Sequence, residues 1–181
     1  MNRALSNCDI CHIITDSTWG GAQRIVLSLA TGTAMNPTVV CNSGGRLVPS
    51  LRNAGVPVGE LSALQSSPSP VADSRTLIQL IRYLRTNDYD IVHCHSTKSG
   101  ALGRIAATVL GLSTVFTVHG WGFYNTSYDR FSLIVRWGEQ ALSYVTDAVV
   151  CVSEHDRAVG RRHDIIGPTD GWVIHNGIEP L

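Results

Sequence analysis

Short apolar runs alternate with helix-period segments along the whole chain, and this alternation limits the possible folds more than any other feature. The runs are rich in Val and Ile, as expected for parallel strands that are covered on both faces. They occupy residues 11–15, 37–41, 56–61, 90–94, 114–118, 148–152 and 172–174. The pattern predicts an α/β protein with an open parallel sheet of about six to seven strands and helices on both faces.

The segments between these runs carry apolar residues at helical spacing. Residues 77–84 place Leu and Ile at positions i, i+3, i+4 and i+7, behind a predicted helix cap at Asp73 or Ser74. Further helices are predicted at residues 22–30, 98–110 and 128–145. Each predicted helix follows a predicted strand, which is the order of a repeated βα unit.

One stretch of low complexity, residues 62–70, holds two Pro and four Ser and is predicted to be a surface loop. A linker between two domains is the alternative, but the βα alternation continues in phase on both sides. The 181 residues suit one domain, so residues 1–181 are expected to form a single unit. Near its end, Ser153 is predicted to cap a last helix.

Composition and charge exclude several classes of function. The chain has 14 Lys and Arg against 14 Asp and Glu, and this balance provides no long-range field for binding nucleic acid. No apolar run is long enough for a spanning helix, and no secretory signal is visible, so a cytoplasmic location is expected. Of five cysteines, Cys41, Cys94 and Cys151 fall in strand-like runs, which indicates buried thiols rather than a disulfide framework.

The N-terminal segment contains a C-x-x-C-H pattern, from Cys8 to His12, of the kind that attaches haem covalently. Its context argues against haem or metal, because no partner C-x-x-C is present and the strand would have to unravel to expose both thiols. Neither haem nor a metal ion is therefore predicted here.

The first polar loop lies between the first strand and the first helix, from Asp16 to Gln23. Ligands of open parallel sheets bind beyond the carboxyl ends of the strands, where Gly20 and Gly21 could bring backbone N–H groups to a phosphate. The loop lacks the full pattern of a known phosphate-binding motif. An ordinary glycine turn is the alternative.

The second polar loop follows the fourth strand and begins with His93 and His95, whose side chains share one face. A metal pair is conceivable, but no third ligand lies near them in sequence, so no metal site is predicted. His95, Ser96 and Lys98 are instead interpreted as lining a cleft. Capping of the next helix by residues 96–99 is the alternative.

The third polar loop, after the fifth strand, holds His119 and three aromatic residues. His119 is the best catalytic candidate, because a purely structural histidine is seldom placed in a loop at this edge. Trp121, Phe123 and Tyr124 could stack on a sugar ring or enter a lipid surface, with Arg130 and Arg136 meeting phosphates. Packing in the protein interior is the alternative for the aromatic residues.

Taken in order, these segments resemble the N-terminal half of a GT-B fold glycosyltransferase of the retaining family 4 type, in its capsular and exopolysaccharide branch. The resemblance covers about residues 11–178 and implies a Rossmann-like fold. Five segments carry it: Gly20 to Gln23, His95 to Arg104, Thr117 to Gly120, Val150 to Ser153, and His175 to Ile178.

The resemblance also implies roles for individual residues. Gly20, Gly21 and Gln23 are expected beside the donor diphosphate and the acceptor, and His119 beside the donor sugar at the reacting centre. His95, Ser96 and Lys98 are expected on the acceptor side, with Trp121 and Phe123. The implied reaction transfers a hexose from a UDP- or GDP-sugar to a lipid-linked or glycan acceptor, with retention of configuration and without a metal or other cofactor.

In this family a second domain holds the nucleotide sugar, and it is expected to follow the hinge at residues 176–178. The chain is therefore expected to be inactive by itself, as one half of a longer enzyme or one subunit of a split one. Peripheral contact with the inner face of the membrane is expected. Two alternatives are a nucleotide-sugar epimerase of the same fold, and a non-catalytic module that binds a glycan or lipid phosphate with a partner chain.

Overall fold

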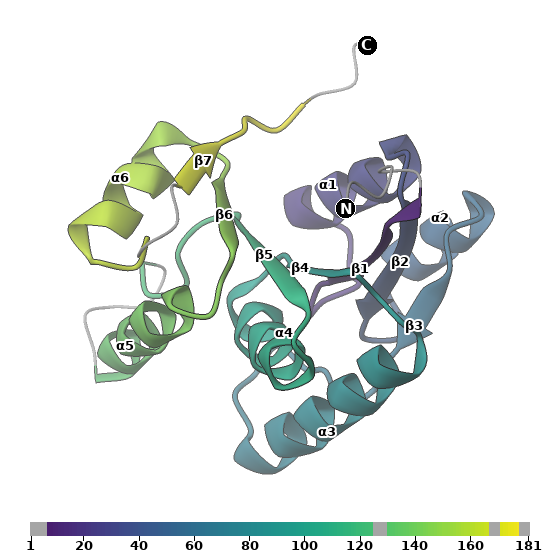
Figure 1. The fold of residues 1–181 in the computed structure, drawn as a ribbon, viewed down its shortest axis with the longest axis horizontal. Coiled ribbons are helices and arrows are strands. Elements are labelled where there is room, and N and C mark those ends of the chain that lie inside the picture. Colours follow the sequence, from purple (N-terminus) through teal and green to yellow (C-terminus); the bar gives the residue numbers. More distant parts are fainter. Residues whose placement is uncertain (1–6, 125–129, 167–170, 178–181) are drawn as a thin grey trace.

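The computed structural model describes residues 7–124, 130–166 and 171–177, which form one parallel seven-stranded sheet flanked by helices (Figure 1). The strands are β1 (Asp9–Ile13), β2 (Asn36–Cys41), β3 (Val58–Glu60), β4 (Ile91–Cys94), β5 (Ser113–Val118), β6 (Ala148–Cys151) and β7 (Gly171–Val173). The predicted α/β class and parallel sheet are thus confirmed.

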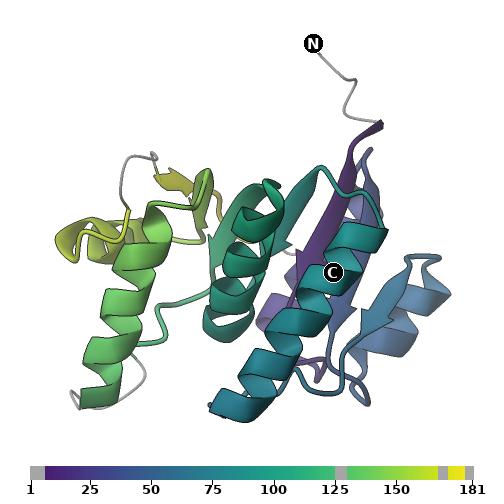
Figure 2. The same cartoon turned by 60° about the horizontal axis from the view of Figure 1, so that its bottom comes forward.

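The helices are α1 (Gly21–Gly32), α2 (Leu47–Asn53), α3 (Pro70–Thr86), α4 (Thr97–Leu110), α5 (Arg130–Ser143) and α6 (Glu154–Arg162). Figure 2 shows α3, α4 and α5 side by side on one face of the sheet, with α1 and α2 on the other. In the part of the chain that the structure describes, no helix has the length and apolarity needed to cross a bilayer.

Two apolar cores hold these layers together. The larger packs α3 and α4 on the sheet through fully buried residues such as Leu80, Ala106 and Val92. The smaller packs α1 and α2 on β2, with Val26, Leu51 and Val39 fully buried. Cys11, Cys41, Cys94 and Cys151 are buried free thiols, as predicted for the last three.

The strand order is β3-β2-β1-β4-β5-β6-β7, so the direction of chain progression reverses between β1 and β4. Loops that leave neighbouring strands in opposite directions at such a point separate from each other and open a crevice at the carboxyl edge. Here the loops after Ile13 and Cys94 flank that point. The fold therefore indicates a ligand site between them.

Three local details differ from the sequence predictions. Helix α2, at residues 47–53, was not predicted, because seven residues containing a Pro give too short a periodic signal. Helix α3 begins at Pro70, with Ser69 accepting from the Ala72 amide, rather than at a cap on Asp73 or Ser74. Residues 128–129 of the predicted helix 128–145 lie outside the described residues. Ser153 does cap α6, as predicted.

Candidate functional site

The loop between β1 and α1 brings polar groups to the carboxyl edge of the sheet. Gln23 donates from Nε2 to the carbonyl oxygen of Asp16, 3.0 Å away, which ties the start of α1 to the end of β1. Gly20 occupies the N-cap position and offers no side-chain acceptor to the first amides of α1. Gly20 and Gly21 lie beside the cavity described below but do not line it, whereas Gln23 does. A phosphate contact for the two glycines stays a prediction.

The loop between β4 and α4 joins the same edge. Ser96 stands at the N-cap of α4, yet its side chain makes no capping hydrogen bond. Its Oγ lies 2.7 Å from Thr15 Oγ1 and 2.7 Å from Ser99 Oγ, so this hydroxyl links β4 to the end of β1. The capping alternative is therefore wrong for the Ser96 side chain.

Lys98 contributes a positive charge at the carboxyl edge of the sheet. Its Nζ pairs with Asp73 Oδ1 at 2.5 Å and donates to the carbonyl oxygen of Ser67 at 2.6 Å. These two contacts connect α4 to the start of α3 and to the preceding loop. The ammonium group is thus already neutralised by a carboxylate within the chain.

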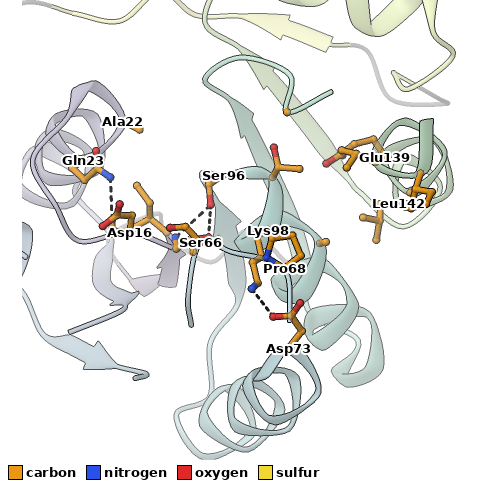
Figure 3. Close-up of a pocket in the computed structure, with 18 residues that line it drawn as sticks. Asp16, Ala22, Gln23, Ser66, Pro68, Asp73, Ser96, Lys98, Glu139 and Leu142 are labelled. Atoms are coloured by element: carbon orange, nitrogen blue, oxygen red, sulfur yellow. Dashed lines mark hydrogen bonds and ion pairs between the residues drawn. The ribbon is translucent and has the colours of Figure 1, made fainter. Parts of the chain in front are cut away.

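A cavity of about 630 Å³ opens where these loops meet (Figure 3). Asp16, Gln23, Ser96 and Lys98 contribute polar groups from the β1 and β4 loops. The remaining lining is mostly apolar and comes from α1, α4, α5 and the loop before α3: Ala22, Pro68, Ala101, Ile134, Val135, Gly138 and Leu142. The carboxylates of Asp73 and Glu139 also line it, so the cavity is amphiphilic, with polar groups at the sheet edge and mostly apolar groups on α5.

Behind the apolar part, a buried ion pair connects α4 to α5. Arg104 Nη2 lies 2.7 Å from Glu139 Oε2, and both side chains are almost fully buried. Burial raises the pKa of Glu139, and the neighbouring Arg104 partly offsets this shift. No sequence pattern predicted this pair, because the two residues lie 35 positions apart on different helices.

Four histidines gather at the carboxyl edge of β1, β4 and β5. His12 Nδ1 lies 3.0 Å from His95 Nε2, and His95 Nδ1 lies 3.4 Å from His119 Nε2. His93 packs on His95 with ring centroids 4.0 Å apart and bonds through Nε2 to Thr117 Oγ1. His95 is 1% exposed and does not line the cavity, so its acceptor-side role stays a prediction.

Burial sets the protonation of these rings. Desolvation lowers the pKa of His12 to about 4, and it lowers the pKa of His93 and His95 well below the ordinary value, with the neighbouring histidines adding to the effect. The pKa of His119 is lowered by burial and partly raised by Asp156. The buried rings of this cluster are therefore neutral near pH 7.

Among the described residues, His12, His93 and His95 form the one group whose ligand atoms lie close enough together, within 4.8 Å, to hold a metal ion. His12, the third member of this group, was not predicted from the sequence. The signal that could have found it is the parallel register, which pairs His12 of β1 with His93 of β4. The contact between His12 and His95 has hydrogen-bond length and direction, so the geometry favours a hydrogen-bonded row over a set of ligands.

The aromatic residues after β5 do not line the cavity. Trp121 is 3% exposed and Phe123 is 8% exposed; their rings stack on each other, and Trp121 Nε1 donates to the Asp156 carbonyl oxygen. The packing alternative is therefore correct for both, and stacking of either ring on a sugar is not supported. Tyr124 is half exposed. The side chain of Arg130 lies outside the described residues, and that of Arg136 is half-buried.

An open parallel sheet with this strand order, and a cavity at its reversal point, defines the Rossmann-like class of ligand-binding domains. A model of the family described as Glycosyltransferase Family 4 matches residues 19–180. The chain therefore belongs to glycosyltransferase family 4.

Comparisons with individual proteins agree with this assignment. The chain is 30% identical to the UDP-Gal:alpha-D-GlcNAc-diphosphoundecaprenol alpha-1,3-galactosyltransferase of Escherichia coli, over 99% of this chain and 47% of that enzyme. Its fold is similar to that of Anabaena HepE in complex with UDP, with a TM-score of 0.74, 17% identity, and coverage of 94% of this chain and 44% of HepE.

The fold is also similar to that of a putative UDP-N-acetylglucosamine 2-epimerase from Listeria monocytogenes, with a TM-score of 0.59 and 14% identity, over 84% of this chain and 41% of that protein. The chain spans about half the length of the relatives that it matches. Rossmann-like GT-B architecture, as expected from the sequence, is confirmed for this half.

Proposed function

We propose that this chain is the acceptor-binding half of a retaining hexosyltransferase that acts on a lipid-linked acceptor in bacterial surface-glycan synthesis. The observation that carries the proposal is the amphiphilic cavity at the reversal point of the sheet. A lipid-linked sugar diphosphate has a polar head and an apolar tail, and the two parts of the cavity match them. The E. coli relative is named for an acceptor of this class.

The polar part suits the diphosphate and its sugar. Helices α1 and α4 both begin here without a hydrogen bond from their own N-cap side chain, whereas α3 and α6 are capped by Ser69 and Ser153. In α4 the Ser99 amide donates to Thr15 Oγ1, and the other first-turn amides have no side-chain acceptor from the N-cap residue. Uncapped first-turn amides and the positive end of a helix stabilise an anion. Lys98 adds a cation that would exchange its partner Asp73 for a phosphate oxygen.

The apolar part suits the first isoprenoid units of the lipid. Ile134, Val135 and Leu142 of α5 face Ala101 of α4 across the cavity. Trp137 is 59% exposed on the same helix, which extends the apolar surface beyond the cavity. A lipid chain lying along α5 would bury this surface. We therefore also propose that the protein works in the cytoplasm in peripheral contact with the inner face of the membrane.

Sugar transfer would need a donor-binding domain on the other side of the acceptor, supplied by the same polypeptide or by a second chain. The nucleotide sugar, a UDP- or GDP-hexose, would lie between the two halves, with His119 beside the sugar. Departure of the nucleotide diphosphate builds negative charge, and amides of Gly20 and Gly21 would help to stabilise it. No residue of this chain is assigned as a nucleophile.

The binding proposal is tested with a GlcNAc-diphosphate lipid carrying a short prenyl chain, titrated into the chain and followed by calorimetry. Gly138 lines the cavity, and a Cβ at this position meets nothing within 4 Å. We expect Gly138→Leu to fill the apolar part and weaken lipid binding by about tenfold, the effect of roughly 1.4 kcal/mol.

Gly138→Ala is the matched control, since it adds one methyl group at the same site and should leave the affinity within about twofold. The same head group without its lipid should bind both variants equally. Equal affinity of the lipid for the Leu variant and the unchanged chain would show that the tail does not enter this cavity.

An epimerase is the alternative enzyme on this fold, and the Listeria structure shows that the architecture alone does not exclude it. The two activities differ in what they need. Incubating the protein, together with its donor-binding half, with a UDP-sugar in the absence of any acceptor separates them. Isomerisation of the UDP-sugar would support the epimerase, whereas transfer of galactose from UDP-galactose to the GlcNAc-diphosphate lipid would support the proposal.

A further inference from the structure

The histidine cluster contains a continuous hydrogen-bonded row that runs from the interior to the carboxyl edge. Its first member, His12, is 3% exposed inside β1, its second, His95, is 1% exposed after β4, and its third, His119, is partly exposed after β5. The contacts are His12 Nδ1 to His95 Nε2 and His95 Nδ1 to His119 Nε2, at 3.0 and 3.4 Å. Both ring nitrogens of His95 thus face another imidazole.

A neutral imidazole carries one N–H donor and one acceptor nitrogen. His95 must therefore donate to one neighbour and accept from the other. If it donates to His12, then His119 donates from Nε2 and leaves Nδ1 as an acceptor. If it donates to His119, then Nε2 of His119 accepts and Nδ1 carries the proton. The tautomers of the three rings are consequently linked.

We propose that His12 and His95 are positioning residues that couple the tautomer of His119 to their own through this hydrogen-bonded row. The arrangement of the row that is lower in free energy then decides whether Nδ1 of His119 presents a donor or an acceptor at the sheet edge. A fixed hydrogen-bonding group does not need to reorient when a ligand binds. His12 exerts this effect without touching His119, through His95.

Burial supports the neutral state that the row requires. Desolvation disfavours a charged imidazole at His12 and His95, and none of the residues that the structure describes places a carboxylate in hydrogen-bond contact with either ring. His93 lies outside the row, because its Nε2 bonds to Thr117 Oγ1 and its contacts with His12 and His95 are ring packing. Substitution of His93 is therefore a control for substitution of His12.

The test is the tautomer of His119 in the chain labelled with ¹⁵N-histidine, read from two-bond ¹H–¹⁵N correlations of each ring near neutral pH. We expect one tautomer for His119 in the unchanged chain. His12→Phe keeps an aromatic ring in the interior but removes the partner of His95 Nε2. This change should release His95 and shift both ring nitrogens of His119 towards the averaged values of a mixed population.

His93→Phe should leave His119 unchanged. Amide spectra and thermal unfolding of each variant verify that the fold is retained. A His119 tautomer that is unaffected by His12→Phe in a folded chain would overturn the proposal, because it would show that the rings are independent.

Addition of zinc is a second, independent test of the proposal. Addition of Zn²⁺ to the unchanged chain should leave the ring resonances of His12 and His95 in place. Stoichiometric shifts of His12, His93 and His95 together would instead identify a metal site and overturn the row. Neither readout uses sugar transfer, so failure of this inference is distinguishable from failure of the proposed function.

Discussion

At the scale of single residues, the buried histidines make the stability of this chain depend on pH. His12, His93 and His95 have pKa values lowered by desolvation, whereas in the unfolded chain they titrate near the ordinary value of about 6.5. Below that pH the unfolded state binds more protons than the folded state, so stability falls with falling pH. The stabilising contribution is complete above about pH 6.5 and is lost towards the folded-state pKa, about 4 for His12.

We expect each of these histidines to contribute a slope of about 1.4 kcal/mol per pH unit within that window. Urea unfolding at about pH 6 and about pH 5 measures the slope. His93→Phe should make it shallower by one proton. The titratable groups next to His12, His93 and His95 are His119 and, beside His119, Asp156. An equal slope in His93→Phe would contradict this account.

Two helical glycines are expected to respond oppositely to the same change. A Cβ on Gly103 would lie 2.6 Å from Cys94 Sγ and 3.1 Å from Ile13 Cδ1, both in the larger core. Gly103→Ala should therefore destabilise the chain by about 1–3 kcal/mol through overpacking. Gly138→Ala, with open space around its Cβ, should stabilise it by roughly 0.5–1 kcal/mol. Thermal unfolding of both variants tests this difference in sign.

At the scale of helices and strands, the pair Arg104 and Glu139 fixes α5 against α4. Arg104 also donates from Nε to the Gly100 carbonyl oxygen and lies 4.1 Å from the Phe116 ring centroid. Its charge is thus held by groups from α4, β5 and α5. Because Ile134, Val135 and Leu142 line the cavity from α5, the same ion pair holds in place the helix that supplies much of its apolar lining.

Removal of one member of this pair should be costly, because it leaves the other charge buried without a partner. We expect Glu139→Leu to destabilise the chain by about 3–5 kcal/mol in urea unfolding. The double variant Arg104→Met with Glu139→Leu should recover much of that loss, since neither charge remains. Simple addition of the two single effects would contradict this interpretation. The exposed pair Glu154 and Arg157 is the control, and Glu154→Ala should cost at most about 0.5 kcal/mol.

At the scale of the whole molecule, the chain corresponds to about half of each relative. It covers 47% of the E. coli galactosyltransferase and 44% of HepE, so each relative has about as much chain again. Catalysis of group transfer depends on groups held on both sides of the reacting atoms. The cavity that we propose for the acceptor is lined by residues of this chain.

We therefore expect the chain by itself to bind the GlcNAc-diphosphate lipid but to transfer no galactose to it from UDP-galactose. A radiolabel transfer assay measures this, first with the chain alone and then with its donor-binding half added or fused. Restored transfer in the presence of the donor-binding half supports the proposal that this chain binds the acceptor and the other half binds the donor. Full activity of the chain alone would show that the donor also binds within these residues.

The sequence by itself determined the class of fold and the edge of the sheet at which we propose a ligand site. Val- and Ile-rich runs and helical periods are local properties, so strands such as β5 and helices such as α4 could be predicted from neighbouring residues. The position of the polar loops after β1, β4 and β5 also followed, because parallel strands end at one edge. Short α2 was missed since its seven residues carry too little periodic signal.

Tertiary structure decided what each side chain at that edge does. Ser96 bonds across to β1 instead of capping α4, and Trp121 and Phe123 pack inside instead of meeting a sugar. His12 joins His95 only because β1 and β4 pair in register, 83 residues apart in sequence. Such contacts depend on which elements become neighbours, and burial then sets their charge. A sequence pattern contains neither the identity of the neighbouring elements nor the burial of a side chain.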